Sequence, residues 1–284
     1  MLPRGGPIRS AATRSGRRPC TRCARYARDV SWDARKQELA GELIRRLYAA
    51  GVIRTWLRDR PDGWELMSGA WSPFYVNFRD APADPELFRF LVDAGSELVR
   101  EELPGATQLV GLAAAGVPFA AGFAYELGLP LGYTRKLPGV RRVEDLADGG
   151  AAAEAYGSHR LVEGGFRPGD RVALVDDLVT GFDSKEIALR QLELELERRG
   201  VEDVHTEAVV VFLERGAEAR RRADAAGVRL VSLLVLDADS VEGLRGAASD
   251  RELEVIAAYL RDPAPFQEPA RRAELTAEAA APTI

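Results

Sequence analysis

The chain has 284 residues, of which 46% are hydrophobic and 29% charged, and its formal net charge is −5. These values are typical of an ordinary globular protein with room for one large or two small domains. No apolar run approaches the roughly 20 residues that a membrane-spanning helix requires, so we expect a cytoplasmic protein with no membrane partner.

Residues 1–30 form a basic arm that carries eight Arg and one acid, Asp29, so the rest of the chain has a net charge of −12. A basic arm can bind nucleic acid or anionic lipid, or act as a transit peptide. The acidic body argues against a nucleic-acid partner, because neutralising phosphates requires a basic surface. We interpret residues 1–30 as a disordered extension, or as the result of a start codon placed too far upstream.

Two cysteines, Cys20 and Cys23, form a CxxC pair inside this arm. A structural zinc site needs about four ligands. The sequence has no second pair, and His159 and His205 lie far along the chain. We therefore expect reduced, incidental cysteines and no metal ligands from the protein itself.

Hydrophobic periodicity and turn residues predict a succession of strands and helices after the arm. In chain order, the expected elements are helix 33–50, strands 64–67 and 74–78, helix 85–103, strand 108–112, helix 117–127, strands 131–134 and 172–175, helix 185–199, strand 204–213, helix 217–226, strand 229–236 and helix 250–260. Their alternation predicts an α/β fold with a parallel sheet covered by helices. We expect one domain over residues 31–261 and a loose tail over residues 262–284, which are rich in Pro, Ala and Glu,.

The segment RVALVDDLVTGFDSK, residues 171–185, carries the strongest chemical signal. Its apolar run, residues 172–175, is typical of a strand buried in a parallel sheet, and Asp176 and Asp177 follow at once,. Ligands of open α/β sheets bind at the carboxyl ends of strands, and carboxylates accept hydrogen bonds from hydroxyl groups. The pair indicates a site for a hydroxyl-bearing ligand; the alternative is two acids that cap a turn.

The turn after the two acids has the composition of an anion site. Thr180 and Gly181 form the turn, and Ser184 is the expected N-cap of the next helix,. Because amide groups at a helix start bind anions, the turn predicts a seat for a phosphate. Phe182 and Asp183 occupy the same turn, and a carboxylate there opposes an anion.

A second loop with small residues, VGLAAAGVP, spans residues 110–118 between a predicted strand and a predicted helix. Its central residues are Ala113, Ala114, Ala115 and Gly116. Residues without bulk let backbone amides approach an anion closely. The alternative is a turn that is small only because the strand and helix pack tightly.

The segment at 171–185 resembles the phosphoribosyl pyrophosphate (PRPP) motif of the type I phosphoribosyltransferases: an apolar run, two acids, two apolar residues, a Thr and a short loop. The loop at 110–118 resembles their pyrophosphate loop, and the following PFAAGFAYELGLPL resembles the orotate members. The resemblance implies a type I phosphoribosyltransferase-like α/β fold. Such a fold has a central, mostly parallel sheet covered by helices and a small N-terminal hood element.

Two further segments narrow the resemblance to the orotate phosphoribosyltransferases. LMSGAWSPFYVNFR, residues 66–79, resembles the element that borders the orotate site, which implies Phe74 and Tyr75 as walls for the pyrimidine ring. VVVFLERGAEARRRADAAGVRLVSLLVL, residues 209–236, resembles the family's strand ending in acid-Arg-Gly, which implies that Arg215 pairs with the orotate carboxylate,. The alternatives are a hairpin with core aromatics and a solvated Arg.

Arg135 and Lys136 resemble the start of the family's catalytic loop. The resemblance implies that both cations offset charge on the departing pyrophosphate. A long insertion separates them from LVEGG, residues 161–165, which resembles the end of the loop. In between, Glu154 and Tyr156 stand where the family's second Lys and its His would be.

The resemblance implies an enzyme that converts orotate and PRPP to orotidine 5′-monophosphate and pyrophosphate, with Mg²⁺ as cofactor and as a homodimer. The acids Asp176 and Asp177 would hold the ribose hydroxyls, with Asp177 also a catalytic residue, while residues 180–184 would hold the 5′-phosphate. Two alternatives stay open. One is a non-catalytic regulator that binds a nucleotide or PRPP; the other is a transferase for another base, because Met67 replaces a Lys that many members carry.

Overall fold

The computed structural model describes residues 31–66, 68–146 and 160–281 of the chain. The chain divides into two units, Met1–Ser31 and Trp32–Ile284, and the helices and strands of the described residues belong to the second. The expected basic arm lies outside the described residues. Met67, which suggested a different base, and Glu154 and Tyr156 of the altered catalytic loop also lie outside the described residues.

A central sheet of seven strands runs through the described part of the chain in the order β11-β10-β8-β5-β6-β7, with β9 paired to β10. Its strands are β5 (Gln108–Gly111), β6 (Leu131–Thr134), β7 (Val162–Glu163), β8 (Arg171–Val175), β9 (Leu178–Val179), β10 (His205–Glu214) and β11 (Arg229–Val235). Neighbours in this sheet pair in parallel except β6 and β7, which pair antiparallel. The mostly parallel sheet predicted from the sequence is confirmed.

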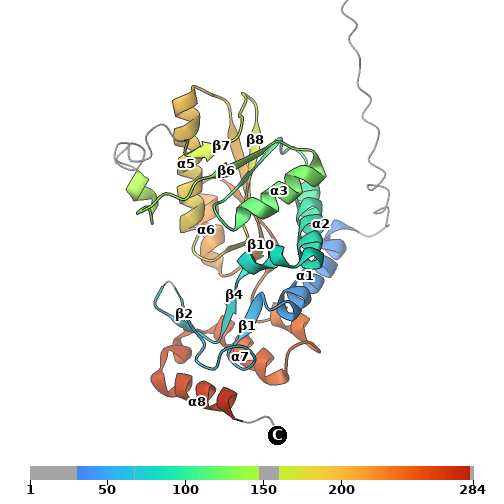
Figure 1. Ribbon diagram of the computed structural model, residues 1–284, viewed down its shortest axis with the longest axis vertical. Helices are drawn as coiled ribbons and strands as arrows, with labels where there is room; N and C mark the ends of the chain where they lie inside the picture. Colours follow the sequence, from blue (N-terminus) through green and yellow to red (C-terminus); the bar gives the residue numbers. More distant parts are fainter. Residues whose placement is uncertain (1–30, 67, 147–159, 282–284) are drawn as a thin grey trace, which may run out of the picture. The chain divides into compact units, whose positions relative to one another are not determined.

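Helices cover both faces of this sheet (Figure 1). The α-helices are α1 (Trp32–Ala49), α2 (Pro85–Glu102), α3 (Gly116–Leu127), α5 (Asp183–Arg199), α6 (Ala217–Ala225), α7 (Asp250–Arg261) and α8 (Pro269–Ala280). Short 3-10 helices are η2 (Phe78–Ala83), η3 (Val143–Leu146), η4 (Ser240–Leu244) and η5 (Ala264–Gln267). The predicted helices therefore form close to their expected bounds, and α8 is an addition.

Strand β8 shows how the sheet separates two hydrophobic cores. Ala173 and Val175 belong to the larger core, together with residues of α1, α2 and α3, whereas Val172 and Leu174 belong to a second core with residues of α5 and α6. Successive side chains of a strand point to opposite faces, so an unbroken apolar run is the signature of a strand buried on both. This burial fixes where β8 ends and hence where its two acids emerge.

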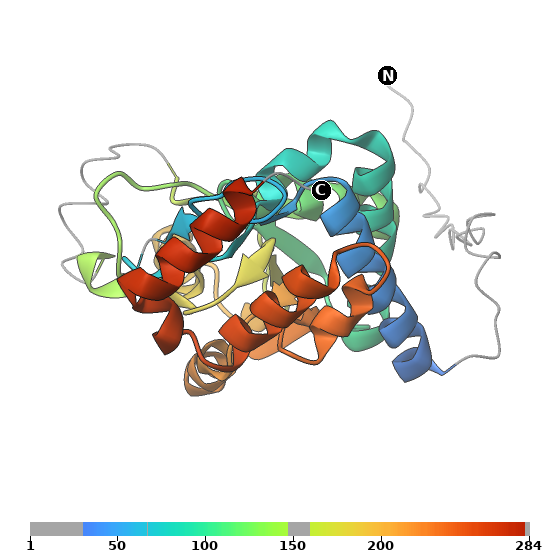
Figure 2. The same ribbon diagram turned by 90° about the horizontal axis from the view of Figure 1, so that it is seen from below.

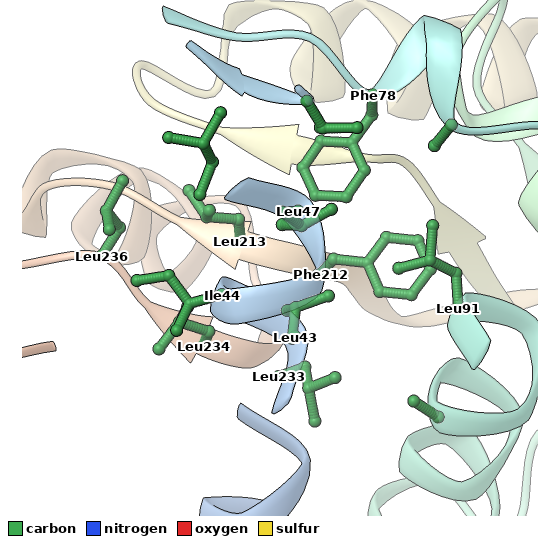
Figure 3. Packing of buried hydrophobic residues seen from close by; sticks show 14 of the residues in the cluster. Leu43, Ile44, Leu47, Phe78, Leu91, Phe212, Leu213, Leu233, Leu234 and Leu236 are labelled. Carbon is green, nitrogen blue, oxygen red and sulfur yellow. The ribbon is translucent and has the colours of Figure 1, made fainter. Parts of the chain in front are cut away.

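Phe212 of β10 lies in the middle of the larger core, among the leucines of α1 and α2 and the ring of Phe78 (Figure 3). Its ring centroid is 5.5 Å from that of Phe78, at an interplanar angle of 12°, and 5.0 Å from that of Phe119, at 83°. Such aromatic contacts add stabilisation beyond burial of area. They attach the N-terminal part of the chain to the sheet.

Two short hairpin-like pairs precede the sheet. Strands β1 (Ile53–Thr55) and β4 (Phe74–Val76) pair antiparallel, as do β2 (Trp64–Glu65) and β3 (Trp71–Ser72). This small N-terminal element is tied to the C-terminal helices, because the buried carboxylate of Glu252 accepts hydrogen bonds from the hydroxyls of Tyr48 and Thr55.

The C-terminal segment is a correction to the loose tail expected over residues 262–284. Instead, η5 and α8 form there, and Figure 2 shows α8 in red at the same end of the fold as α7. Leu275 is 0% exposed, and Arg251 pairs with Glu278 at 2.8 Å. The overall composition of this segment suggested disorder. Composition does not show that Leu275 can be buried, or that Pro269 is well placed to start a helix,.

If α8 is part of the folded core, Leu275→Ala should lower the free energy of unfolding by about 2–5 kcal/mol, because it leaves a cavity. Urea unfolding followed by circular dichroism measures this change. Glu274→Ala, at an exposed neighbouring site, is the control and should change the free energy by less than about 0.5 kcal/mol. Equal stability of the two variants would show that α8 does not contribute to the core.

Candidate active site

The two acids predicted from the sequence lie at the carboxyl end of β8, in the middle of the sheet. The backbone keeps its pairing with β10 through them: the Asp176 N–H donates to the Val210 carbonyl, and the Phe212 N–H to the Asp177 carbonyl, both at 3.0 Å. Asp176 is 8% exposed and Asp177 is half-buried. The sheet thus holds both acids rigidly at the carboxyl end of a central strand.

Lys185 is the site residue whose role the sequence did not predict. The residue is 4% exposed, and its ammonium donates to Asp176 Oδ2 at 2.8 Å, to the Leu178 carbonyl at 2.7 Å and to Ser184 Oγ at 3.2 Å. A buried ammonium requires such partners. The only indication in the sequence was that Lys185 is one of just three lysines in a chain that otherwise uses Arg.

Asp177 differs from its neighbour in electrostatics. Its Oδ1 accepts the Leu178 N–H at 2.8 Å. Burial, and then the adjacent Asp176 carboxylate, raise the pKa of Asp177 far above the ordinary value for Asp,. Asp176, in contrast, has a direct cationic partner in Lys185. The two acids are therefore not equivalent.

The turn from Thr180 to Ser184 is open toward solvent, with the exception of one ring. Phe182 has a left-handed backbone conformation, with φ of 80°, and its side chain is 2% exposed within the core beneath α5. The ring therefore does not fill the predicted phosphate seat. The expected N-cap, Ser184, is wrong: α5 begins at Asp183, and the N-H groups of Lys185 and Glu186 donate to the Phe182 carbonyl.

The carboxylate of Asp183, which opposed a phosphate at this turn, is held by an arginine from α6. Arg222 Nη2 lies 2.9 Å from Asp183 Oδ1, and the same guanidinium donates to the Gly181 carbonyl and to Glu186. This hydrogen bond lowers the pKa of Asp183. Arg222 thus supplies a compensating charge at the turn and braces its backbone, a role that the sequence did not reveal.

The small-residue loop after β5 packs directly against the acids. The Leu112 N–H donates to the Val175 carbonyl at 2.9 Å, and the Ala113 N–H to Thr134 Oγ1 at 3.0 Å. A Cβ on Gly116 would lie 2.1 Å from the Val175 oxygen and 2.9 Å from the Cα of Asp176. Only glycine permits this approach, which brings the loop and the acid pair together.

An open pocket of about 530 Å³ lies beside this loop. Its lining residues come from the loop, from the start of α3 and from the end of β6: Ala113, Ala114, Val117, Pro118, Tyr133, Thr134, Arg135 and Lys136. The predicted catalytic pair and the predicted pyrophosphate loop therefore share one pocket. The position of this pocket, at the carboxyl ends of parallel strands, is the usual one for a ligand.

Arg135 and Lys136 differ in their surroundings. The Arg135 guanidinium contacts Glu163 of β7 at 2.8 Å, and its side chain is 37% exposed. Lys136 is exposed at the pocket. The pairing with Glu163 reduces the net charge that Arg135 presents toward a ligand.

At the other end of the site, Arg215 follows β10 and lies over aromatic rings. Its guanidinium carbon is 4.9 Å from the ring centroid of Phe74 and 5.4 Å from that of Tyr259. Phe74 is 1% exposed, which corrects its expected role as a pocket wall: the ring supports Arg215 from within the core,. Tyr75 is half-buried and stacks on Trp64, with 6.1 Å between centroids.

Nowhere in residues 31–66, 68–146 and 160–281 do three or more His, Cys, Asp or Glu side chains gather in a way that could hold a metal ion. No helix in these ranges has the length and apolar character to cross a membrane.

The chain is similar to known orotate phosphoribosyltransferases in sequence and in fold. The chain is 31% identical to an orotate phosphoribosyltransferase from Pyrobaculum aerophilum over 221 residues, which cover 77% of this chain and 97% of that protein. An orotate phosphoribosyltransferase structure from Aeropyrum pernix matches 72% of this chain and 99% of its own, with 26% identity and a TM-score of 0.53. No protein-family model matches the chain.

The fold has a further relative in the UMP synthase of Leishmania donovani, with a TM-score of 0.60 and 22% identity over 78% of this chain and 42% of that one. The strand order of the sheet, the small-residue loop and the acid pair agree with these structural similarities. Together they define a phosphoribosyltransferase of the type I fold. Within that class, the chain belongs to the orotate phosphoribosyltransferase family. The resemblance recognised in the sequence is confirmed.

Replacing Lys185 tests the buried charge pair. Lys185→Met should lower the free energy of unfolding at pH 7 by about 3–5 kcal/mol, because Asp176 stays buried without its cation. Urea denaturation measures the loss. Lys36→Met is the control. It removes a more exposed Lys, which contacts Glu102 at 3.0 Å, so the free energy of unfolding should fall by no more than about 1 kcal/mol. Similar costs in both variants would contradict a special role for Lys185.

The raised pKa of Asp177 predicts a pH dependence of stability. Between the ordinary pKa of Asp and the raised value, the folded protein binds a proton that the unfolded chain has lost, so this group makes the protein less stable as pH rises,. Asp177→Asn should therefore gain stability over wild type from pH 4 to pH 7, by about 1.4 kcal/mol per unit of pKa shift.

Urea denaturation at four or five pH values measures this difference. The exposed Asp224→Asn variant on α6 serves as the control. A difference between Asp177→Asn and wild type that does not change with pH would rule out the raised pKa.

Proposed function

We propose that this protein transfers the phosphoribosyl group of PRPP to orotate, giving orotidine 5′-monophosphate and pyrophosphate. The carrying observation is the contact of the loop at Gly116 with the strand end at Val175 and Asp176, next to a pocket that also receives Lys136. PRPP bears hydroxyls between a phosphate and a diphosphate. A carboxylate pair flanked by two amide-rich loops has the complementary arrangement.

The ribose and its 5′-phosphate would bind along β8 and the start of α5. Asp177 is the acid with capacity to accept hydroxyl hydrogen bonds, because Asp176 is already held by Lys185. Thr180 and the amides at the start of α5, before the Lys185 N–H that donates to the Phe182 carbonyl, would bind the phosphate,. Arg222 would keep the Asp183 charge from repelling it.

The diphosphate would lie against residues 113–116. Its departure from C1′ leaves negative charge on the pyrophosphate oxygens, and fixed cations aimed at developing charge lower the barrier. Lys136 and Arg135 would supply this charge, and Glu163 neutralises part of the charge of Arg135. At the other end, Arg215 would meet the orotate carboxylate, and Tyr75 would border the ring.

Mg²⁺ fits this site in one limited way. The ion is commonly held by one or two carboxylates together with substrate phosphates, rather than by a cage of protein ligands. Asp177, with Asp176 beside it, would hold the ion at the ribose end of the diphosphate. When bound, Mg²⁺ supplies charge neutralisation of the diphosphate.

The proposal extends to organisation. Family resemblance supports a homodimer in the cytoplasm that works without nucleic acid or membrane, consistent with the acidic body. The docking of α8 supports a transferase domain that continues beyond residue 261 to the end of that helix.

The enzyme assay uses the full chain with Mg²⁺, PRPP and orotate, and follows the loss of orotate absorbance. We expect turnover by wild type and a loss of about 100-fold or more for Asp177→Asn, with folding intact by circular dichroism. Asp224→Asn is the matched control and should retain full activity. A fully active Asp177→Asn variant would overturn the role given to this acid.

The same assay separates the two alternative functions. Calorimetric binding of PRPP without turnover of any base would indicate a regulator, and turnover with a different base would indicate another transferase. The regulator was suggested by Phe182 and Asp183 and by the altered catalytic loop. The first ground is weaker in the structure, because the Phe182 ring is in the core and Asp183 is paired with Arg222. The loop departures at Glu154 and Tyr156 lie outside the described residues.

A further inference from the structure

The face of α5 that packs against the fold is polar where an apolar stripe is usual. Lys185, Gln191 and Glu195 on this face are 4%, 3% and 2% exposed. A helix that packs on a sheet normally buries hydrophobic side chains there, and buried polar groups are stabilised only when hydrogen-bonded. Each of these side chains does find a partner, and the partners lie in segments that form the site.

Three side chains of α5, spaced four residues apart, bind the backbone at the base of the loop that starts with Arg135 and Lys136. Gln191 Nε2 donates to the Arg135 carbonyl at 2.8 Å. Glu195 Oε2 accepts the Leu161 N–H at 2.7 Å. Arg199 Nη1 donates to the Gly164 carbonyl at 2.6 Å, and its Nη2 to the Val162 carbonyl.

These contacts reach both sides of the loop base. The outgoing side at Arg135 and the returning side at Leu161 are also joined to each other, because the Arg135 N–H donates to the Leu161 carbonyl at 3.0 Å. Glu195 is itself oriented by Arg199 Nε at 2.7 Å. Residues four apart on a helix share one face, so a single rigid helix fixes the backbone on both sides.

We propose that Gln191, Glu195 and Arg199 are positioning residues that aim Lys136 and Arg135 into the pocket. This inference rests on the proposed function, in which these cations act on the departing pyrophosphate. The same helix holds Asp176 through Lys185 at its first turn. One element therefore sets the distance between the acids that hold the ribose and the cations that act on the leaving group.

The test compares kcat with KM. Gln191→Leu removes the donor to the Arg135 carbonyl with little change in size, and Glu195→Leu removes the acceptor for Leu161. Small misplacements of catalytic groups lower rates by up to about 100-fold, so we expect kcat to fall 10- to 100-fold while KM for PRPP and orotate changes less than threefold. Glu195→Gln, which retains an acceptor oxygen for Leu161, should recover most of kcat.

Glu193→Leu is the matched control, because Glu193 lies on the same helix with its side chain 62% exposed. It should retain kcat within twofold. The proposal is overturned if Gln191→Leu and Glu195→Leu also keep kcat within twofold. It is equally overturned if Glu195→Gln is as impaired as Glu195→Leu, since the charge pair within the helix, and not the loop contact, would then matter.

Limited trypsin digestion gives a readout that needs no activity. Arg141 and Arg142 are exposed beyond the loop base, and cleavage there follows local opening of the backbone. Gln191→Leu and Glu195→Leu should be cut at these sites several times faster than wild type and Glu193→Leu. If wild type shows no turnover of orotate, the enzyme assignment fails, whereas unchanged cleavage rates would overturn the positioning role itself.

Discussion

The active site depends on a contact between two stretches of backbone. Because Gly116 has no side chain, the loop after β5 lies on the Val175 carbonyl at a distance that any Cβ would prevent. That contact puts loop amides beside the acids, while β6, the next strand, brings Lys136 to the same pocket. A substrate with a ribose between two phosphate groups requires just such neighbouring seats, and sheet register sets their spacing.

The second constraint is charge balance among acids gathered at one sheet edge. Lys185 pairs with Asp176, and Arg222 pairs with Asp183 as well as with Glu186, so two of the acids have a cation beside them. Asp177 has none as close, and burial together with its neighbour raises its pKa. Among these three acids, Asp177 is thus the one without a close cation. Binding of a cation, or of hydroxyl groups that donate hydrogen bonds to its carboxylate, would favour its ionised form.

The sequence predicted the sheet and its helices, because burial on both faces leaves apolar runs. It placed the acids at the carboxyl end of a strand, where ligands of such sheets bind, whereas only the family resemblance linked them to the small-residue loop. It did not predict that Lys185 turns inward, since the first turn of a helix usually exposes its charges. Phe74 was misplaced because a three-residue strand is too short for alternation to tell a pocket wall from a core ring,. Helix α8 was hidden by its Pro- and Ala-rich composition.

The attachment of the C-terminal segment to the hood has a consequence for synthesis of the protein. Gln267 accepts a hydrogen bond from the Trp71 N–H at 2.8 Å and donates to its carbonyl at 3.1 Å, 196 residues away in the chain. Strand β3 therefore gains these two hydrogen bonds only after Gln267 has been synthesised. Until then the hood lacks its attachment to the C-terminal segment, so the N-terminal element that is made first reaches its final packing late.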